Sequence, residues 1–359
     1  MKKNSVANTI TKTTAVWPIG KKMRHLLFLE MAQKKTSISQ LRNECLMEEY
    51  PAETEETDPS FLALANQGKT RWHTYLAGVF VMGSIWIFGS VILIVTIFGE
   101  AFVTGEKPLE STDPVTNFVT LCLTFVALIA GLWVAISYIH KRPLRSLITP
   151  YTTIRQSRLW QGFKWQIILI IAIALIEELL YPGTYHYTLD PKQFYTFLAL
   201  TLLFIPLQAT SEELLMRGYF LQGLAHFTRH PIFLICINGL AFMALHFANP
   251  EIEHGLPIWL TYFAWGAFLT FITLKDNTTE LAIGIHVANN MFASIFVNYE
   301  GSALPTNTVL TAQEIHPWFS LISYVLSAFA LYWILLRPKP PTPSDRMAKN
   351  NDAQQIESL

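Results

Sequence analysis

The sequence predicts an all-α fold, a polytopic membrane helix bundle of about eight transmembrane helices. Of its 359 residues, 51% are hydrophobic and only 14% are charged, whereas soluble domains average nearer a quarter charged residues. Apolar runs long enough to cross a bilayer as a helix recur along the chain. These runs are residues 75–98, 115–139, 165–181, 193–216, 231–248, 257–274, 281–298 and 317–336.

The distribution of positive charge supports this number of spans. Eight spans leave both termini on one side of the membrane, and 24 of the 26 Lys and Arg residues then lie on that side. Only Lys107 and Lys192 lie on the other. Because cytoplasmic loops carry the excess of Lys and Arg, we expect an integral, multi-pass membrane protein with both termini cytoplasmic.

Composition divides the chain into five expected parts. They are a cytosolic N-terminal extension (1–74), N-terminal transmembrane helices (75–181), a core that carries the polar motifs (182–298), a last loop and transmembrane helix (299–336) and a disordered, Pro-rich cytosolic tail (337–359). The early apolar run Leu26–Leu29 is broken by Glu30, which argues against a signal peptide. The three cysteines are scattered and imply neither a disulfide framework nor a cysteine metal site.

A first polar group, Glu212-Glu213 with Arg217, interrupts the fourth apolar run. Glu213 and Arg217 are four residues apart, so on a helix they share a face and can pair. Glu212 points about 100° away and is left free for general-base work. A solvated helix end explains this segment equally well when it is taken alone. A second Glu pair, Glu177-Glu178, has no such arginine and is interpreted as interfacial.

Two further polar groups lie in later apolar runs. His246 follows Phe242 by four residues, and His286 precedes Asn290 by four, so each pair shares a helix face. An imidazole and an amide on one face can polarise a carbonyl group or hold a water. The structural alternatives are a hydrogen-bonded core histidine, simple packing of Phe242 and a polar contact between helices.

The order of the helices brings these groups together. Residues 193–216 and 231–248 form an antiparallel hairpin, and Glu212 and His246 each lie 17 residues from Arg229 in its turn. Equidistant residues of a hairpin lie at the same depth, so Glu212 and His246 are expected to meet. We expect a site sunk in the membrane, completed by the run that carries His286 and open to cytosolic water.

The motifs Glu-Glu-x-x-x-Arg, Phe-x-x-x-His and His-x-x-x-Asn follow in this order on successive predicted membrane helices. This pattern resembles the CPBP family, the CAAX-processing and bacteriocin-processing intramembrane proteases, also called the Abi family. The resemblance covers roughly residues 193–298, about a third of the chain. The matching residues are Glu212, Glu213, Arg217, Phe242, His246, His286 and Asn290.

The resemblance implies an all-helical membrane bundle, commonly of eight spans. It implies that Glu212 is the base that activates water and that Glu213 and Arg217 are a supporting pair. It also implies that Asn290 helps to stabilise the oxyanion, while His246 and His286 correspond to the two motif histidines. The implied function is an intramembrane endopeptidase that hydrolyses peptide bonds at the cytosolic membrane face, with His286 beside Asn290 binding the carbonyl oxygen.

The sequence leaves one alternative open for the cofactor and one for the class of function. His246, His286 and Glu212 could hold Zn²⁺ with water in the fourth position, but the chain lacks the His-Glu-x-x-His pair of helical zinc proteases. No cofactor is favoured, and zinc is the alternative. The expected partners are a peptide or protein substrate at the membrane and the lipid bilayer, with no nucleic acid. A non-catalytic membrane scaffold or bacteriocin-immunity protein with the same polar core is the alternative function, ahead of a small-solute transporter.

The charge distribution generates a topology prediction. Loops 99–114, 182–192, 249–256 and 299–316 are expected outside the cell. Cysteines placed at Thr104 and Thr308 should therefore react with a membrane-impermeant reagent in intact cells. Protection of both positions would overturn the eight-span arrangement.

Overall fold

The computed structural model describes residues 60–104, 113–304 and 306–337. Each of the eight predicted apolar runs overlaps one long helix, so the predicted all-α class is confirmed. These helices are α4 (Trp72–Thr104), α6 (Pro114–Val134), α7 (Gln156–Leu180), α8 (Pro191–Glu213), α10 (Pro231–Leu245), α11 (Leu256–Asp276), α12 (Glu280–Ile295) and α13 (Pro317–Leu336).

Short helices and strands connect them. The helices are η2 (Phe61–Asn66), η3 (Ala135–Ile139), η4 (Leu144–Leu147), η5 (Leu214–Phe220), α9 (Leu221–Leu224) and η6 (Pro250–His254), and the strands are β1 (Tyr185–Tyr187), β2 (Val297–Tyr299) and β3 (Leu310–Ala312).

Within the part of the chain that the structure describes, five helical stretches are long and apolar enough to cross a membrane. They are residues 72–99, 114–139, 191–224, 256–276 and 317–336. The remaining long helices are less typical, since α10 is a shorter apolar helix, α12 has 16 residues and α7 carries charged residues near both ends. The bundle is therefore a polytopic membrane fold, and the total of eight spans stays a prediction.

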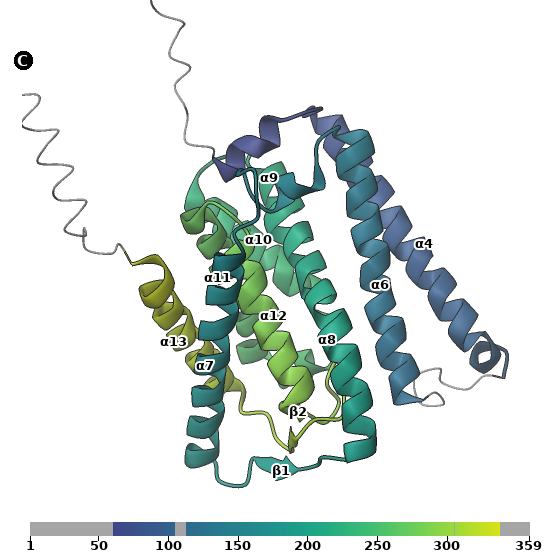
Figure 1. The fold of residues 1–359 in the computed structure, drawn as a ribbon, viewed down its shortest axis with the longest axis vertical. Coiled ribbons are helices and arrows are strands. Elements are labelled where there is room, and N and C mark those ends of the chain that lie inside the picture. The colour runs from purple at the N-terminus through teal and green to yellow at the C-terminus, as the bar shows by residue number, and fades with distance from the viewer. Residues whose placement is uncertain (1–59, 105–112, 305, 338–359) are drawn as a thin grey trace, which may run out of the picture. The chain divides into compact units, whose positions relative to one another are not determined.

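Helix α12 lies between α7 and α8 (Figure 1) and approaches α7 closely. A Cβ atom on Gly284 would lie 2.1 Å from the Leu159 carbonyl oxygen, and one on Gly162 would lie 2.6 Å from the Leu281 carbonyl oxygen. Small residues allow membrane helices to pack backbone against backbone. This contact fixes the rotation of α12 and so the direction of its residue His286.

Ion pairs hold the start of α12 to its neighbours. Arg155 at the start of α7 binds Asp276 at the end of α11 and Glu280 at the start of α12, each at 2.7 Å. Arg158 pairs with the same Asp276. Asp276 and Glu280 are buried, so these arginines neutralise charges that would otherwise be costly.

The opposite end of the bundle carries a small sheet in the order β1-β3-β2, at the bottom of Figure 1. Strand β1 pairs antiparallel with β3, and β2 pairs parallel with β3. The carboxylate of Glu178 accepts hydrogen bonds from the backbone amides of Gly183 and Tyr185 at 2.8 and 3.1 Å. It therefore stabilises the turn into β1, in keeping with the interfacial interpretation of the Glu177-Glu178 pair.

Several expectations from the sequence lie beyond the described residues or need revision. Residues 1–59 of the N-terminal extension, Cys45 and residues 338–359 of the tail lie outside the described ranges. Thr308 is 1% exposed and donates a hydrogen bond to the carbonyl oxygen of Leu310, so a cysteine there would be a poor reporter. Glu253 in η6 is exposed and tests the same predicted side of the membrane.

The burial of His140 predicts how the stability of the fold depends on pH. Burial lowers the pKa of His140 from 6.5 to about 4, and its ring nitrogens contact the Lys69 carbonyl oxygen and the Tyr219 hydroxyl, each at 3.0 Å. As the pH falls from 6.5 to about 4, the unfolded chain binds this proton before the folded chain does, so stability is lost.

The test compares wild type with His140→Gln by thermal unfolding of the purified protein at pH 7 and at pH 5. The wild-type unfolding temperature should fall more between these two pH values than that of the variant. Equal pH dependence of the two proteins would contradict the prediction.

Candidate active site

A buried ion pair forms the base of the site. Glu213 and Arg217 are both 0% exposed, and the Arg217 Nη1 atom lies 2.9 Å from Glu213 Oε1. This is the pairing that the four-residue spacing predicts. The local helix is not the regular α-helix that was expected, because Arg217 lies in η5, which is a π-helical segment. Such segments are rare and occur often at functional sites.

Other elements supply the remaining partners of Arg217. Its Nη2 atom donates to the Gly266 carbonyl oxygen of α11 at 3.2 Å. Its guanidinium lies 4.7 Å from the ring centroid of Phe242 in α10, a cation–π distance. Phe242 therefore forms a wall of the site, as its spacing from His246 suggested, and it also faces the arginine.

His286 joins this buried pair through one of its ring nitrogens. Its Nδ1 atom lies 2.7 Å from Glu213 Oε1. An ionised carboxylate only accepts hydrogen bonds, so we assign the proton of the neutral ring to Nδ1. Nε2 then lies 3.8 Å from Glu212 Oε2, which is too long for a direct hydrogen bond and suits a bridging water.

A chain of amides holds Glu212. Gln208 donates from Nε2 to Glu212 Oε1. Asn290 in turn donates to Gln208 Oε1 at 3.0 Å, and Asn289 donates to Asn290 Oδ1 at 3.2 Å. Sequence reasoning found Asn290, set Asn289 aside and missed Gln208. The available signal was that Gln208 precedes Glu212 by four residues and so shares its helix face.

His246 lies at the end of α10, which stops at Leu245 rather than continuing to residue 248. Its Nδ1 atom donates to the Phe242 carbonyl oxygen at 2.8 Å, and its ring stacks on Tyr262 with centroids 4.5 Å apart. The expected contact between His246 and Glu212 is therefore indirect. Both side chains line the same cavity, but their hydrogen bonds go to other partners. Tyr262 had no sequence signal of its own.

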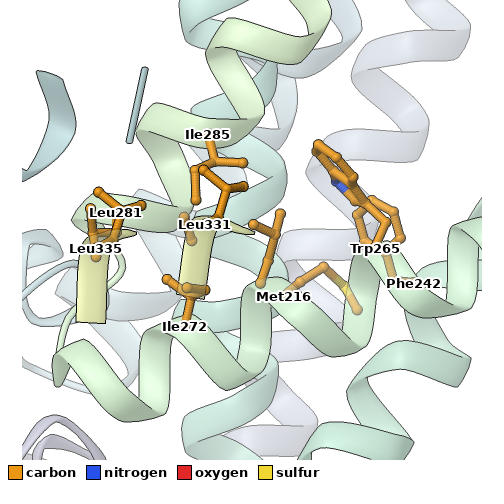
Figure 2. Packing of buried hydrophobic residues seen from close by; sticks show 10 residues of the cluster. Met216, Phe242, Trp265, Ile272, Leu281, Ile285, Leu331 and Leu335 are labelled. Carbon is orange, nitrogen blue, oxygen red and sulfur yellow. The ribbon is translucent and has the colours of Figure 1, made fainter. Parts of the chain in front are cut away.

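The candidate catalytic side chains share one cavity of about 580 Å³, which Glu212, His246, His286 and Asn290 all line. Polar and aromatic residues surround them. The buried core packs against one side of this site, where Met216, Phe242 and Trp265 lie together (Figure 2). The structure therefore brings together the four residues that the sequence singled out, and Gln208 joins them.

Zinc binding by these side chains stays an untested alternative. Among the described residues, no group of three or more His, Cys, Asp or Glu side chains is placed to hold a metal ion. Nδ1 of His286 is bound to Glu213, and Nδ1 of His246 is bound to a backbone carbonyl group. Metal-ligating histidines show the same kind of contact, so these hydrogen bonds do not distinguish the two cofactor alternatives.

The burial of the Glu213–Arg217 pair generates a stability prediction. Removing one partner of a buried pair leaves the other charge uncompensated and costs about 3–5 kcal/mol. Arg217→Ala should therefore lower the amount of folded protein recovered from membranes. Glu212→Gln should not, because Gln208 can still donate to the new amide oxygen. Size-exclusion chromatography in detergent measures both, and equal losses would refute this division of roles.

Comparison with known proteins agrees with the motif assignment. Residues 193–292 match the family model described as type II CAAX prenyl endopeptidase Rce1-like. The uncharacterized protein YyaK of Bacillus subtilis (strain 168) is 32% identical over 252 residues, which are 68% of this chain and 83% of that protein. No solved structure matches at a significant level. The chain is thus an integral membrane protein and belongs to the CPBP family of CAAX-processing and bacteriocin-processing membrane proteases.

Proposed function

We propose that this protein is an intramembrane endopeptidase in which Glu212 activates the attacking water. The observation that carries the proposal is the separation of the two neighbouring glutamates. Glu213 is fully buried and paired, whereas Glu212 is oriented by Gln208 and lines the cavity. A carboxylate that is positioned but not neutralised by a cation can act as a general base.

The geometry supports the following steps of peptide hydrolysis. A water held between Glu212 Oε2 and His286 Nε2 gives its proton to Glu212 as its oxygen attacks the peptide carbonyl carbon. Asn290 uses one amide hydrogen on Gln208, so its second can donate to the carbonyl oxygen as that oxygen becomes negative. Glu212 then passes the proton to the nitrogen of the leaving amine, and the C–N bond breaks.

The two histidines take different parts in this scheme. The contact of His286 with Glu213 leaves Nε2 as an acceptor in the neutral ring, so His286 holds the water. The sequence-based expectation that it donates to the carbonyl oxygen would require a second ring proton. His246 also carries its proton on Nδ1, towards Phe242, and its Nε2 is available to relay protons between the cavity and the leaving group.

A peptide-cleavage assay tests the proposal. Wild-type protein in liposomes should cleave members of a fluorogenic peptide library, and Glu212→Gln should lose this cleavage while remaining folded. The matched control is Glu253→Gln, at an exposed carboxylate away from the cavity, which should keep wild-type rates. Full cleavage by Glu212→Gln would favour the scaffold function.

The same assay separates the two cofactor alternatives. Asn290→Ala should slow the chemical step by about 10²–10³-fold, the usual effect of losing one oxyanion donor, with little change in KM. A chelator should leave most activity intact. Complete loss of cleavage on chelation, restored by added metal, would overturn the metal-free mechanism.

A further inference from the structure

Four of the long helices line the cavity with one half. Residues 166–177 of α7, 258–265 of α11, 286–293 of α12 and 319–327 of α13 contribute to the wall. In each of these four helices this is the half nearer the sheet β1-β3-β2, whereas Gln208 and Glu212 of α8 line the cavity from the half farther from the sheet. Tyr185, Val297 and Ala312, one from each strand, also line the cavity. The cavity therefore extends from the candidate catalytic residues to the sheet end of the bundle.

The other end of the bundle is closed by apolar packing. Ile272, Leu281 and Leu335 are 0%, 0% and 9% exposed and belong to one core cluster with Met216. Figure 2 shows the side chains of this apolar layer, with Ile272, Leu281, Leu335 and Met216 labelled. Beyond this layer lie the ion pairs that join Arg155 to α11 and α12. Among the described residues, this end is therefore filled by packed apolar side chains rather than by the cavity.

Polar side chains line the cavity along its length. They are Asn249, Asn289, Asn298, Ser302, Ser320 and Ser323. Buried polar groups normally form hydrogen bonds, and a peptide backbone offers an N–H or a carbonyl group at nearly every residue. An apolar lipid chain offers neither. The wall therefore suits an extended polypeptide segment.

We propose that the substrate is a polypeptide segment that enters the site from the sheet end, the side of the membrane opposite the termini. This inference rests on the proposed protease function and names its access route. Lys and Arg are concentrated at the closed end, so the positive-inside rule makes the sheet end the outer side. This proposed route differs from the opening to cytosolic water that the sequence led us to expect.

Cysteine accessibility tests the route independently of cleavage. Single cysteines are introduced into full-length protein in which Cys45, Cys122 and Cys236 have been replaced. Ser323→Cys lies on the cavity wall, and Ile322→Cys, its neighbour, lies on an exposed, lipid-facing surface of α13 (57% exposed). Glu253→Cys marks the sheet end, and Arg229→Cys marks the opposite end; both residues are exposed.

A charged, impermeant thiol reagent applied to intact cells should modify Ser323→Cys and Glu253→Cys. It should leave Ile322→Cys unmodified, and it should reach Arg229→Cys only after the cells are opened. The modified Ser323→Cys protein should also lose peptide cleavage, because the attached group occupies the cavity.

Modification of Ser323→Cys only in inverted vesicles, or from neither side, would overturn the proposed route. A different result would contradict the protease function. If the labelling is as expected but Glu212→Gln cleaves as well as wild type, the cavity opens outward and the chemistry assigned to it is wrong.

Discussion

The constraint on which the site depends is a fully buried arginine. Arg217 is 0% exposed within an apolar bundle, and an uncompensated charge at such a position is costly. Its partners come from α8, α10 and α11. One of them, Glu213, also binds His286 of α12. Satisfying a single guanidinium therefore fixes four parts of the chain relative to one another, and the candidate catalytic geometry follows from this arrangement.

Local helix geometry makes these contacts possible. Helix η5 is a π-helical segment, a kind often found at functional sites. Asn238 of α10 donates at 2.8 Å to the Met216 carbonyl oxygen, which also accepts from the Leu221 amide. Arg217 in the same segment donates to the Gly266 carbonyl oxygen of α11. The irregular turn thus ties α10 and α11 to the end of α8, close to Glu212. Backbone irregularity at this depth is tolerated because it is buried in protein rather than exposed to lipid.

The sequence predicted what depends on spacing along a helix. Pairs four residues apart, such as Glu213 with Arg217, appear in the structure because the α-helical period brings them together. Equal distances from a hairpin turn also placed Glu212 and His246 on one cavity. Contacts that depend on how helices rotate against each other were not predictable. The backbone approach at Gly284 sets the direction of His286, and the hydrogen bond from Asn290 to Gln208 joins α12 to α8; neither has a motif in the sequence.

Hydrolysis within a membrane requires water and an extended peptide at the same point, and a single cavity lined by both polar and apolar side chains can supply both. The three-stranded sheet explains how such a cavity can open at one end of an otherwise apolar bundle. Strands and irregular loops leave backbone groups that hydrocarbon cannot satisfy, so this segment is best placed at the membrane surface, where water reaches it. The apolar layer around Ile272 and Leu281 closes the opposite end. A bundle that packs apolar side chains at one end and carries a cavity towards the other can deliver water to Glu212 without opening a channel across the membrane.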